Sequence, residues 1–104
     1  MNNKINEEKL NKLLNLYQNH DYDNLISNIK TELKDFDHPI LYNLLGAALI
    51  NKNDLIDAED NYKTLTDKFP KYIDGFVNLG TVYQKMKRYD DAVNQYNSVL
   101  DMEN

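Results

Sequence analysis

Apolar residues recur at spacings of three and four along most of the chain, which is the pattern of amphipathic helices. The clearest stretches predict helices over about 39–52, 55–68, 73–86 and 89–102. Pro39 and Pro70 mark boundaries, because proline has no N–H to donate inside a helix. Two weaker stripes predict further helices over about 6–19 and 23–36. No segment alternates as a half-buried strand does, so the pattern predicts an all-α domain.

From residue 39 onward the chain repeats itself after 34 positions, the distance from Leu45 to Leu79. Three features recur in register: Leu45-Gly46 as Leu79-Gly80, Ala58 as Ala92, and Tyr62 as Tyr96. Self-similarity at a fixed spacing predicts a helix pair stacked on a copy of itself, with a more divergent unit before them. Gly46 and Gly80 would leave room for a large side chain of the other helix. Stacked units present an extended surface, which favours a binding module over an enzyme pocket.

These positions together resemble the tetratricopeptide repeat. The resemblance rests on Tyr42, Leu45, Gly46, Leu49, Ala58, Tyr62 and Pro70, then on Phe76, Leu79, Gly80, Tyr83, Tyr89, Ala92 and Tyr96. The first unit departs from the pattern, with Leu13 where a small residue is expected and Leu25 where the alanine is. The resemblance implies an all-α fold, an α-α superhelix (solenoid) of three antiparallel helix pairs. It also implies a single domain over 1–104, with units of about 6–38, 39–72 and 73–104.

The overall charge narrows the range of partners. The 104 residues carry a formal net charge of −5 and have an isoelectric point of about 4.8, whereas nucleic-acid backbones need a clustered basic surface. We therefore expect no nucleic-acid partner. No run approaches the roughly 18 apolar residues of a membrane span. No apolar stretch follows the N-terminal Met1-Asn2-Asn3-Lys4-Ile5, so we also expect no membrane partner and a cytoplasmic protein.

Residues that could carry catalysis or hold a cofactor do not form a recognisable set. The chain has no cysteine, and its two histidines, His20 and His38, lack the acidic neighbours of a metal-binding motif. Carboxylates that begin the second helices, such as Asp57 and Asp91, complement the helix dipole instead. The three glycines are isolated, so no phosphate-binding loop is seen. We therefore predict no catalytic residue, no metal site, no cofactor and no enzymatic activity.

The resemblance implies that the first helix of each pair lines a concave groove, which holds a protein or peptide ligand. The predicted partner-binding residues are Asn43, Ala47, Ile50, Asp74, Asn78, Thr81, Gln84 and Lys85. Asparagine side chains suit the backbone amides of an extended peptide. Leu10, Leu14 and Leu44 also face inward in this register. Two interpretations stay open for these leucines: they line the groove, or they pack between neighbouring first helices.

Members of the family that bind chaperone tails hold the terminal carboxylate with a clamp of basic residues. The corresponding positions here are Leu10, Leu14, Leu44, Asp74 and Asn78, and none of them is basic. The resemblance therefore argues against a chaperone tail as the ligand.

Two further hypotheses concern the whole chain. The stretch 38–47 is similar to repeats that precede bacterial sulfotransferase and glycosyltransferase domains, where such repeats would serve substrate recruitment or dimerisation. The stretch 89–102 carries more apolar residues than one partner helix can cover, among them Val93, Val99 and Leu100. Because an exposed apolar strip usually marks an interface, we expect self-association through this C-terminal helix or a following domain that covers it.

Overall fold

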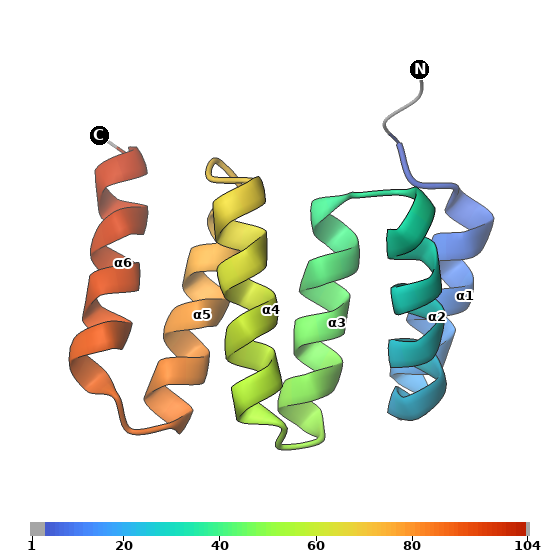
Figure 1. Cartoon of the computed structure of the whole chain (residues 1–104), viewed down its shortest axis with the longest axis horizontal. Coiled ribbons are helices and arrows are strands. Elements are labelled where there is room, and N and C mark those ends of the chain that lie inside the picture. The colour runs from blue at the N-terminus through green and yellow to red at the C-terminus, as the bar shows by residue number, and fades with distance from the viewer. Residues whose placement is uncertain (1–3, 104) are drawn as a thin grey trace.

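The computed structural model describes residues 4–103 and contains six helices in that range. In chain order they are α1 (Glu7–Gln18), α2 (Tyr22–Asp35), α3 (Pro39–Asn51), α4 (Leu55–Lys68), α5 (Ile73–Lys85) and α6 (Tyr89–Glu103). The predicted all-α fold is confirmed, and each observed helix end lies within one residue of its predicted place. Each helix packs against the next one, so α1–α2, α3–α4 and α5–α6 form three pairs in one array (Figure 1).

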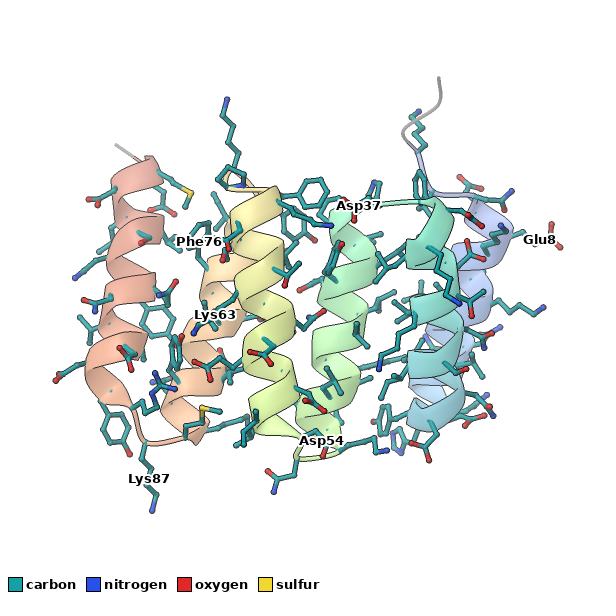
Figure 2. All side chains as sticks on the ribbon, viewed as in Figure 1. Glu8, Asp37, Asp54, Lys63, Phe76 and Lys87 are labelled. Carbon is teal, nitrogen blue, oxygen red and sulfur yellow. The ribbon has the colours of Figure 1, made fainter. Side chains whose placement is uncertain are left out.

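The array has two edges with different connections. The turns within the pairs lie at one edge, where Figure 2 labels Asp54 and Lys87, and the connections between pairs lie at the opposite edge, near Asp37. Among the first helices of the pairs, α3 contacts α5 directly, and a hydrogen bond joins α1 to α3. The first helices therefore share one face of the array.

Each turn within a pair uses the same backbone geometry. The residue after the helix C-cap has a positive φ, which is 59° at His20, 62° at Asn53 and 63° at Lys87. The next N–H bonds back to a carbonyl in the last helical turn, as from Asp54 to Leu49 at 2.9 Å. This is the Schellman arrangement, which satisfies the last carbonyls of a helix. Glycine usually takes the left-handed position, and here three residues with a Cβ hold it.

The predicted close contact between the two helices of a pair is confirmed at both glycines. A Cβ on Gly80 would lie 2.5 Å from Cε1 of Tyr96, and a Cβ on Gly46 would overlap the ring of Tyr62. No real side chain tolerates such a distance, so the tyrosine rings occupy the space that the glycines leave.

In the first pair, a residue larger than glycine lies on the first helix and one smaller than tyrosine lies on the second. Leu13 and Leu25 stand where the other pairs have glycine and alanine, and both leucines are buried. Ile29 stands where the other pairs have tyrosine, and it is also buried. A smaller residue on the second helix therefore accommodates a larger one on the first.

The expected burial of Tyr89 is wrong. The resemblance makes it a core position of its repeat, yet 59% of its surface is exposed. Its counterpart in the preceding pair, Leu55, is half-buried. Tyr89 begins α6, and α5 is the helix packed along α6 within residues 4–103, so one side of α6 stays open.

Candidate functional site

The predicted partner-binding residues lie on α3 and α5, two helices that contact each other. None of the eight is buried, and Asp74, Gln84 and Lys85 are the most exposed of them. We call the surface around them the inner face. It consists of Leu10, Leu14, Tyr17, Ile40, Asn43, Leu44, Ala47, Ile50, Asp74, Val77, Asn78, Thr81, Gln84 and Lys85. The structure thus brings the predicted residues to one accessible surface made by the first helices.

A direct hydrogen bond joins α3 to α5 across the inner face. Nδ2 of Asn78 donates to Oδ1 of Asn43 at a distance of 2.6 Å, and both side chains are half-buried. This bond uses one donor and one acceptor, which leaves the amide N–H₂ of Asn43 and the amide oxygen of Asn78 on the same surface. Exchanging O and N of both amides would leave the same combination of one donor group and one acceptor. The pair can therefore bond a ligand that offers an acceptor and a donor side by side.

A second cross-helix contact involves Asn51, which sequence reasoning missed. Its Nδ2 donates to the hydroxyl of Tyr17 at 3.2 Å and to the carbonyl of Ala47 at 2.8 Å. Asn51 therefore joins α1 to α3 on the inner face. The apolar pattern places Asn51 near the end of the predicted helix 39–52 and gives no sign of this contact, and the structure makes Asn51 the last residue of α3.

Two of the predicted residues already have partners within the chain. The hydroxyl of Thr81 donates to the carbonyl of Val77 at 3.1 Å. The Oε1 of Gln84 accepts from the hydroxyl of Tyr96 at 2.8 Å and so joins α5 to α6. The Gln84 amide N–H₂ and the second lone pair of the Thr81 oxygen keep bonding capacity for a ligand.

The inward-facing apolar residues divide into two groups. Leu44, Ile50 and Tyr17 are partly buried and pack against the hydrophobic core. Leu10 and Leu14 are also half-buried, but they do not belong to that packed set. Leu44 therefore packs against the core, while Leu10 and Leu14 leave apolar area on α1.

The centre of the inner face carries almost no charge. The ring of Tyr62 is buried under α3 and its hydroxyl donates to the carbonyl of Asn43 at 3.4 Å. Burial raises the pKa of Tyr62 well above the usual tyrosine value, so this hydroxyl stays protonated. Charges occur only at the two ends of α5, with Asp74 in its first turn and Lys85 in its last. The centre of the face therefore suits neutral amide and hydroxyl groups.

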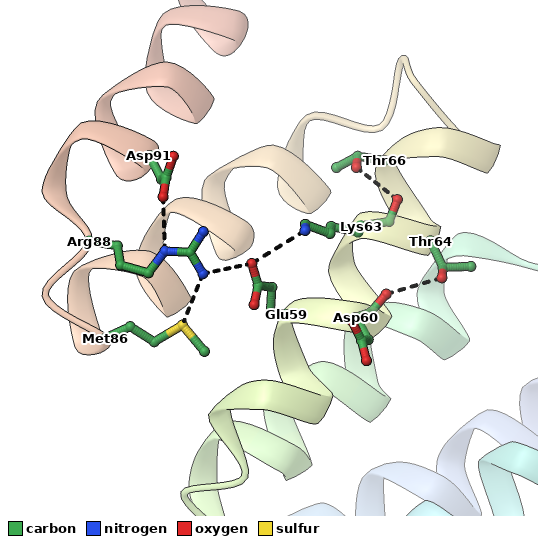
Figure 3. A network of polar contacts seen from close by, with 8 residues as sticks. All are labelled: Glu59, Asp60, Lys63, Thr64, Thr66, Met86, Arg88 and Asp91. Atoms are coloured by element: carbon green, nitrogen blue, oxygen red, sulfur yellow. Dashed lines mark hydrogen bonds and ion pairs between the residues drawn. The ribbon is translucent and has the colours of Figure 1, made fainter.

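Charged side chains form a separate network on the second helices, shown in Figure 3. The guanidinium of Arg88 contacts Oε2 of Glu59 at 3.0 Å and Oδ2 of Asp91 at 2.9 Å, and it lies 4.6 Å from the Tyr83 ring centroid. Burial acts to raise the pKa of Glu59, but the hydrogen bond from Tyr83 and the charges of Lys63 and Arg88 outweigh it and lower that pKa. Because the network joins α4 to the α5–α6 turn, its role is to hold neighbouring pairs together.

The structure gives two further findings for residues 4–103. No helix in this range combines the length and the apolar character needed to cross a membrane. The same part of the chain holds no group of three or more histidine, aspartate or glutamate side chains placed to bind a metal ion.

Residues 73–104, the third pair, match the family model described as the tetratricopeptide repeat. The Sgt2 TPR domain from Aspergillus fumigatus superposes with a TM-score of 0.85 at 19% identity, covering 97% of this chain and 70% of that one. No curated protein matches the chain.

Two other solved structures have the same fold. The second TPR domain of Spaghetti (RPAP3), bound to the HSP90 peptide SRMEEVD, gives a TM-score of 0.81 at 14% identity and covers 91% of this chain and 89% of that one. The structure described as MamA MSR-1 C2 gives 0.80 at 17% identity and covers 91% and 55%. The third helix pair thus matches the tetratricopeptide repeat model, and the chain has the fold of these domains over nearly all of its length.

Proposed function

We propose that this chain is a protein–protein interaction module whose inner face binds an extended peptide or a segment of a partner protein. The observation that carries the proposal is the 2.6 Å bond between Asn43 and Asn78, which leaves an amide donor and an amide acceptor together on an accessible surface. An extended peptide offers a carbonyl and an N–H at every residue, so its backbone can bond to both groups. The asparagine pair would then hold the ligand by its backbone without selecting particular side chains.

The neighbouring residues would supply the side-chain contacts. Ala47 and Ile50 on α3, with Leu10 and Leu14 on α1, offer apolar area to one side of the asparagine pair. The residues of α5 offer polar groups on the other side: Asp74, Thr81, Gln84 and Lys85. We therefore propose a ligand with apolar side chains toward α1 and polar side chains toward α5.

The similarity to the RPAP3 domain supports a peptide ligand in general terms, because that domain was solved with a peptide bound. The mode of binding proposed for this chain is different. Asp74 and Asn78 stand where a clamp for a terminal carboxylate needs basic residues, and Asp74 would repel such a group. We therefore propose that the ligand is held along its backbone and not by its C-terminus.

Peptides selected from a random displayed library on the chain provide the ligand for a test. We expect Asn78→Ala to weaken binding of a selected peptide by about tenfold, because it removes a bond to the peptide backbone. The free energy of unfolding should fall by only about 0.5–1 kcal/mol, from loss of the half-buried bond to Asn43, which is less than the tenfold loss of binding represents. Fluorescence anisotropy and urea unfolding give the two numbers.

The matched control is Thr64→Ala on α4. Thr64 is exposed, and its hydroxyl donates to the Asp60 carbonyl of its own helix at 3.0 Å. The control should leave peptide binding unchanged. Unchanged binding in an Asn43→Ala/Asn78→Ala variant would move the site off the inner face. Equal losses of binding and stability in Asn78→Ala would show that this residue is structural instead.

We propose one domain of three units, at about 6–38, 39–72 and 73–104, working in the cytoplasm without catalytic activity or cofactor. No residue of the chain requires an oxidising compartment, because there is no cysteine to form a disulfide. Limited proteolysis should leave a fragment that spans all three units. A stable product without α1 and α2 would contradict the single domain.

A further inference from the structure

One side of α6 exposes a strip of large apolar residues. Tyr89, Val93 and Leu100 are 59%, 53% and 57% exposed, and we call these three residues the α6 strip. Spacings of four and seven residues place them within about 40° of one another around the helix, since each residue advances it by roughly 100°. Figure 1 shows α6 at one end of the array, with α5 beside it. The strip is therefore a continuous apolar surface along the open side of α6.

Equivalent positions inside the array are covered by a helix. Val93 and Leu100 stand 34 positions after Glu59 and Thr66 of α4. The side chain of Glu59 is 12% exposed and Thr66 is 9% exposed. A Cβ on Gly75 of α5 would lie 3.3 Å from Cγ2 of Thr66, so the covering helix approaches this place closely. This place in the fold thus accepts a helix that presents a small residue, and α6 is more apolar there than α4 is.

Acidic side chains accompany the α6 strip. Asp90, Asp101 and Glu103 are exposed, and the structure describes no ion pair for them within residues 4–103. The fourth carboxylate of the helix, on Asp91, pairs with Arg88. No lysine or arginine lies on α6. Any helix that covers the strip therefore meets negative charge near both ends of α6.

The charge distribution argues against a second copy of the chain at this surface. Two α6 helices packed antiparallel would bring Asp90 of one copy toward Asp101 and Glu103 of the other, and parallel packing would oppose identical carboxylates. The helix α1 of a second copy is a poorer match for the strip, because its fully exposed residues are all polar and its leucines Leu10 and Leu14 are half-buried on the inner face. The net charge of −5 adds to the repulsion between copies.

From these observations we propose that the α6 strip docks an amphipathic helix of a partner protein whose apolar stripe is flanked by lysine or arginine residues. Small and apolar side chains of that helix would pack on Val93 and Leu100, in the way that α5 packs on α4. Basic flanks would lie beside Asp90 and Asp101 and offset their charge. The strip is separate from the inner face, so the chain can hold a peptide and a docked helix at the same time.

Two synthetic helical peptides test this proposal. Both carry the same stripe of alanine and leucine; one has lysine flanks and the other has glutamate flanks. At low ionic strength the full chain should bind the lysine peptide at least about tenfold more tightly, and salt should reduce that preference. Leu100→Asn and Val93→Asn should each weaken lysine-peptide binding by about tenfold, because each removes apolar contact area. Fluorescence anisotropy of labelled peptides measures all of these affinities.

The matched control is Ile56→Asn. Ile56 lies on α4 and is 72% exposed, so it is an apolar surface residue outside the strip, and its replacement should not change the affinity. Equal binding of the two peptides, or equal effects of Ile56→Asn and Leu100→Asn, would overturn the proposal.

Two measurements on the unaltered chain test it independently. Amide chemical shifts during titration with the lysine peptide should change most on α6, and changes centred on the inner face would contradict the docking site. Sedimentation of the chain alone should show a monomer at tens of micromolar, roughly the range in which weak dimers form. A dimer that Leu100→Asn dissociates would identify a second copy as the occupant and would overturn the assignment to a partner helix.

Discussion

At the scale of single residues, the fit between the two helices of a pair depends on combined size. Gly46 faces Tyr62 and Gly80 faces Tyr96, with no space for a Cβ on either glycine. A glycine inside a helix costs about 1 kcal/mol relative to alanine, so the close contact must offset that loss. The first pair has Leu13 and Ile29 at the corresponding positions and buries both, so the sizes are divided differently there.

Exchanging sizes in the third pair tests this matching directly. Gly80→Leu should lower the free energy of unfolding by about 1–3 kcal/mol, because the leucine must displace the ring of Tyr96. Tyr96→Ile should also be destabilising, since it leaves a cavity over Gly80. The double variant copies the arrangement of Leu13 and Ile29, so its loss should be smaller than the sum of the single losses. Urea unfolding of the wild type, both single variants and the double variant gives the coupling energy. Additive losses would mean that Gly80 and Tyr96 do not compete for space.

At the scale of helices and turns, three turns share one backbone geometry and hold different residues at the left-handed position. This position holds His20, Asn53 and Lys87, with φ between 59° and 63°. A residue with a Cβ costs roughly 1–2 kcal/mol in this conformation, and asparagine costs less than most because its short polar side chain bonds locally. Because the backbone geometry is the same in all three turns, the conformational cost of histidine, asparagine and lysine at this position can be compared within one chain.

Lys87→Gly should raise the free energy of unfolding by about 1 kcal/mol, because glycine adopts a positive φ without strain. Removing the lysine side chain should cost few contacts, because it projects away from the array in Figure 2. Asn53→Gly should give a smaller gain, since asparagine already tolerates this conformation. Urea unfolding of both variants gives the order of the gains. A gain at Asn53 equal to that at Lys87 would show that backbone strain does not distinguish the two turns.

The helices could be predicted from the sequence because their apolar stripes are long and prolines mark two of the boundaries. The type of turn could not be predicted, because lysine at position 87 does not indicate a positive φ as glycine would. The bond between Asn43 and Asn78 joins residues 35 positions apart, and helical periodicity does not fix how neighbouring pairs stack. The exposure of Tyr89 escaped prediction for a related reason, since the repeat pattern assigns a core position without saying whether another helix covers it.

At the scale of the whole molecule, buried tyrosines link folding to pH. Burial is the largest cause that raises the pKa of Tyr42, Tyr62 and Tyr72, and it raises the pKa of Tyr83 to about 12 with help from the hydrogen bond to Glu59. These residues belong to α3, α4 and α5 or lie directly before α5, so the effect spans the array. Each folded-state pKa lies above the unfolded value of 10.0, so the folded chain holds its protons more tightly.

The sign of this linkage predicts alkaline unfolding. The stabilisation from a raised pKa is fully present below the unfolded value of 10.0 and is lost as pH rises toward the folded value, which for Tyr83 is about 12. The free energy of unfolding should therefore fall above roughly pH 10, by up to about 1.4 kcal/mol per pH unit for each proton released on unfolding. Tyr83→Phe should lower stability near neutral pH, because it removes the bond to Glu59. The same variant should reduce the slope between the unfolded and folded values, because phenylalanine has no proton to lose. Urea unfolding across this pH range measures the slope, and an unchanged slope in Tyr83→Phe would show that Tyr83 does not take part in the linkage.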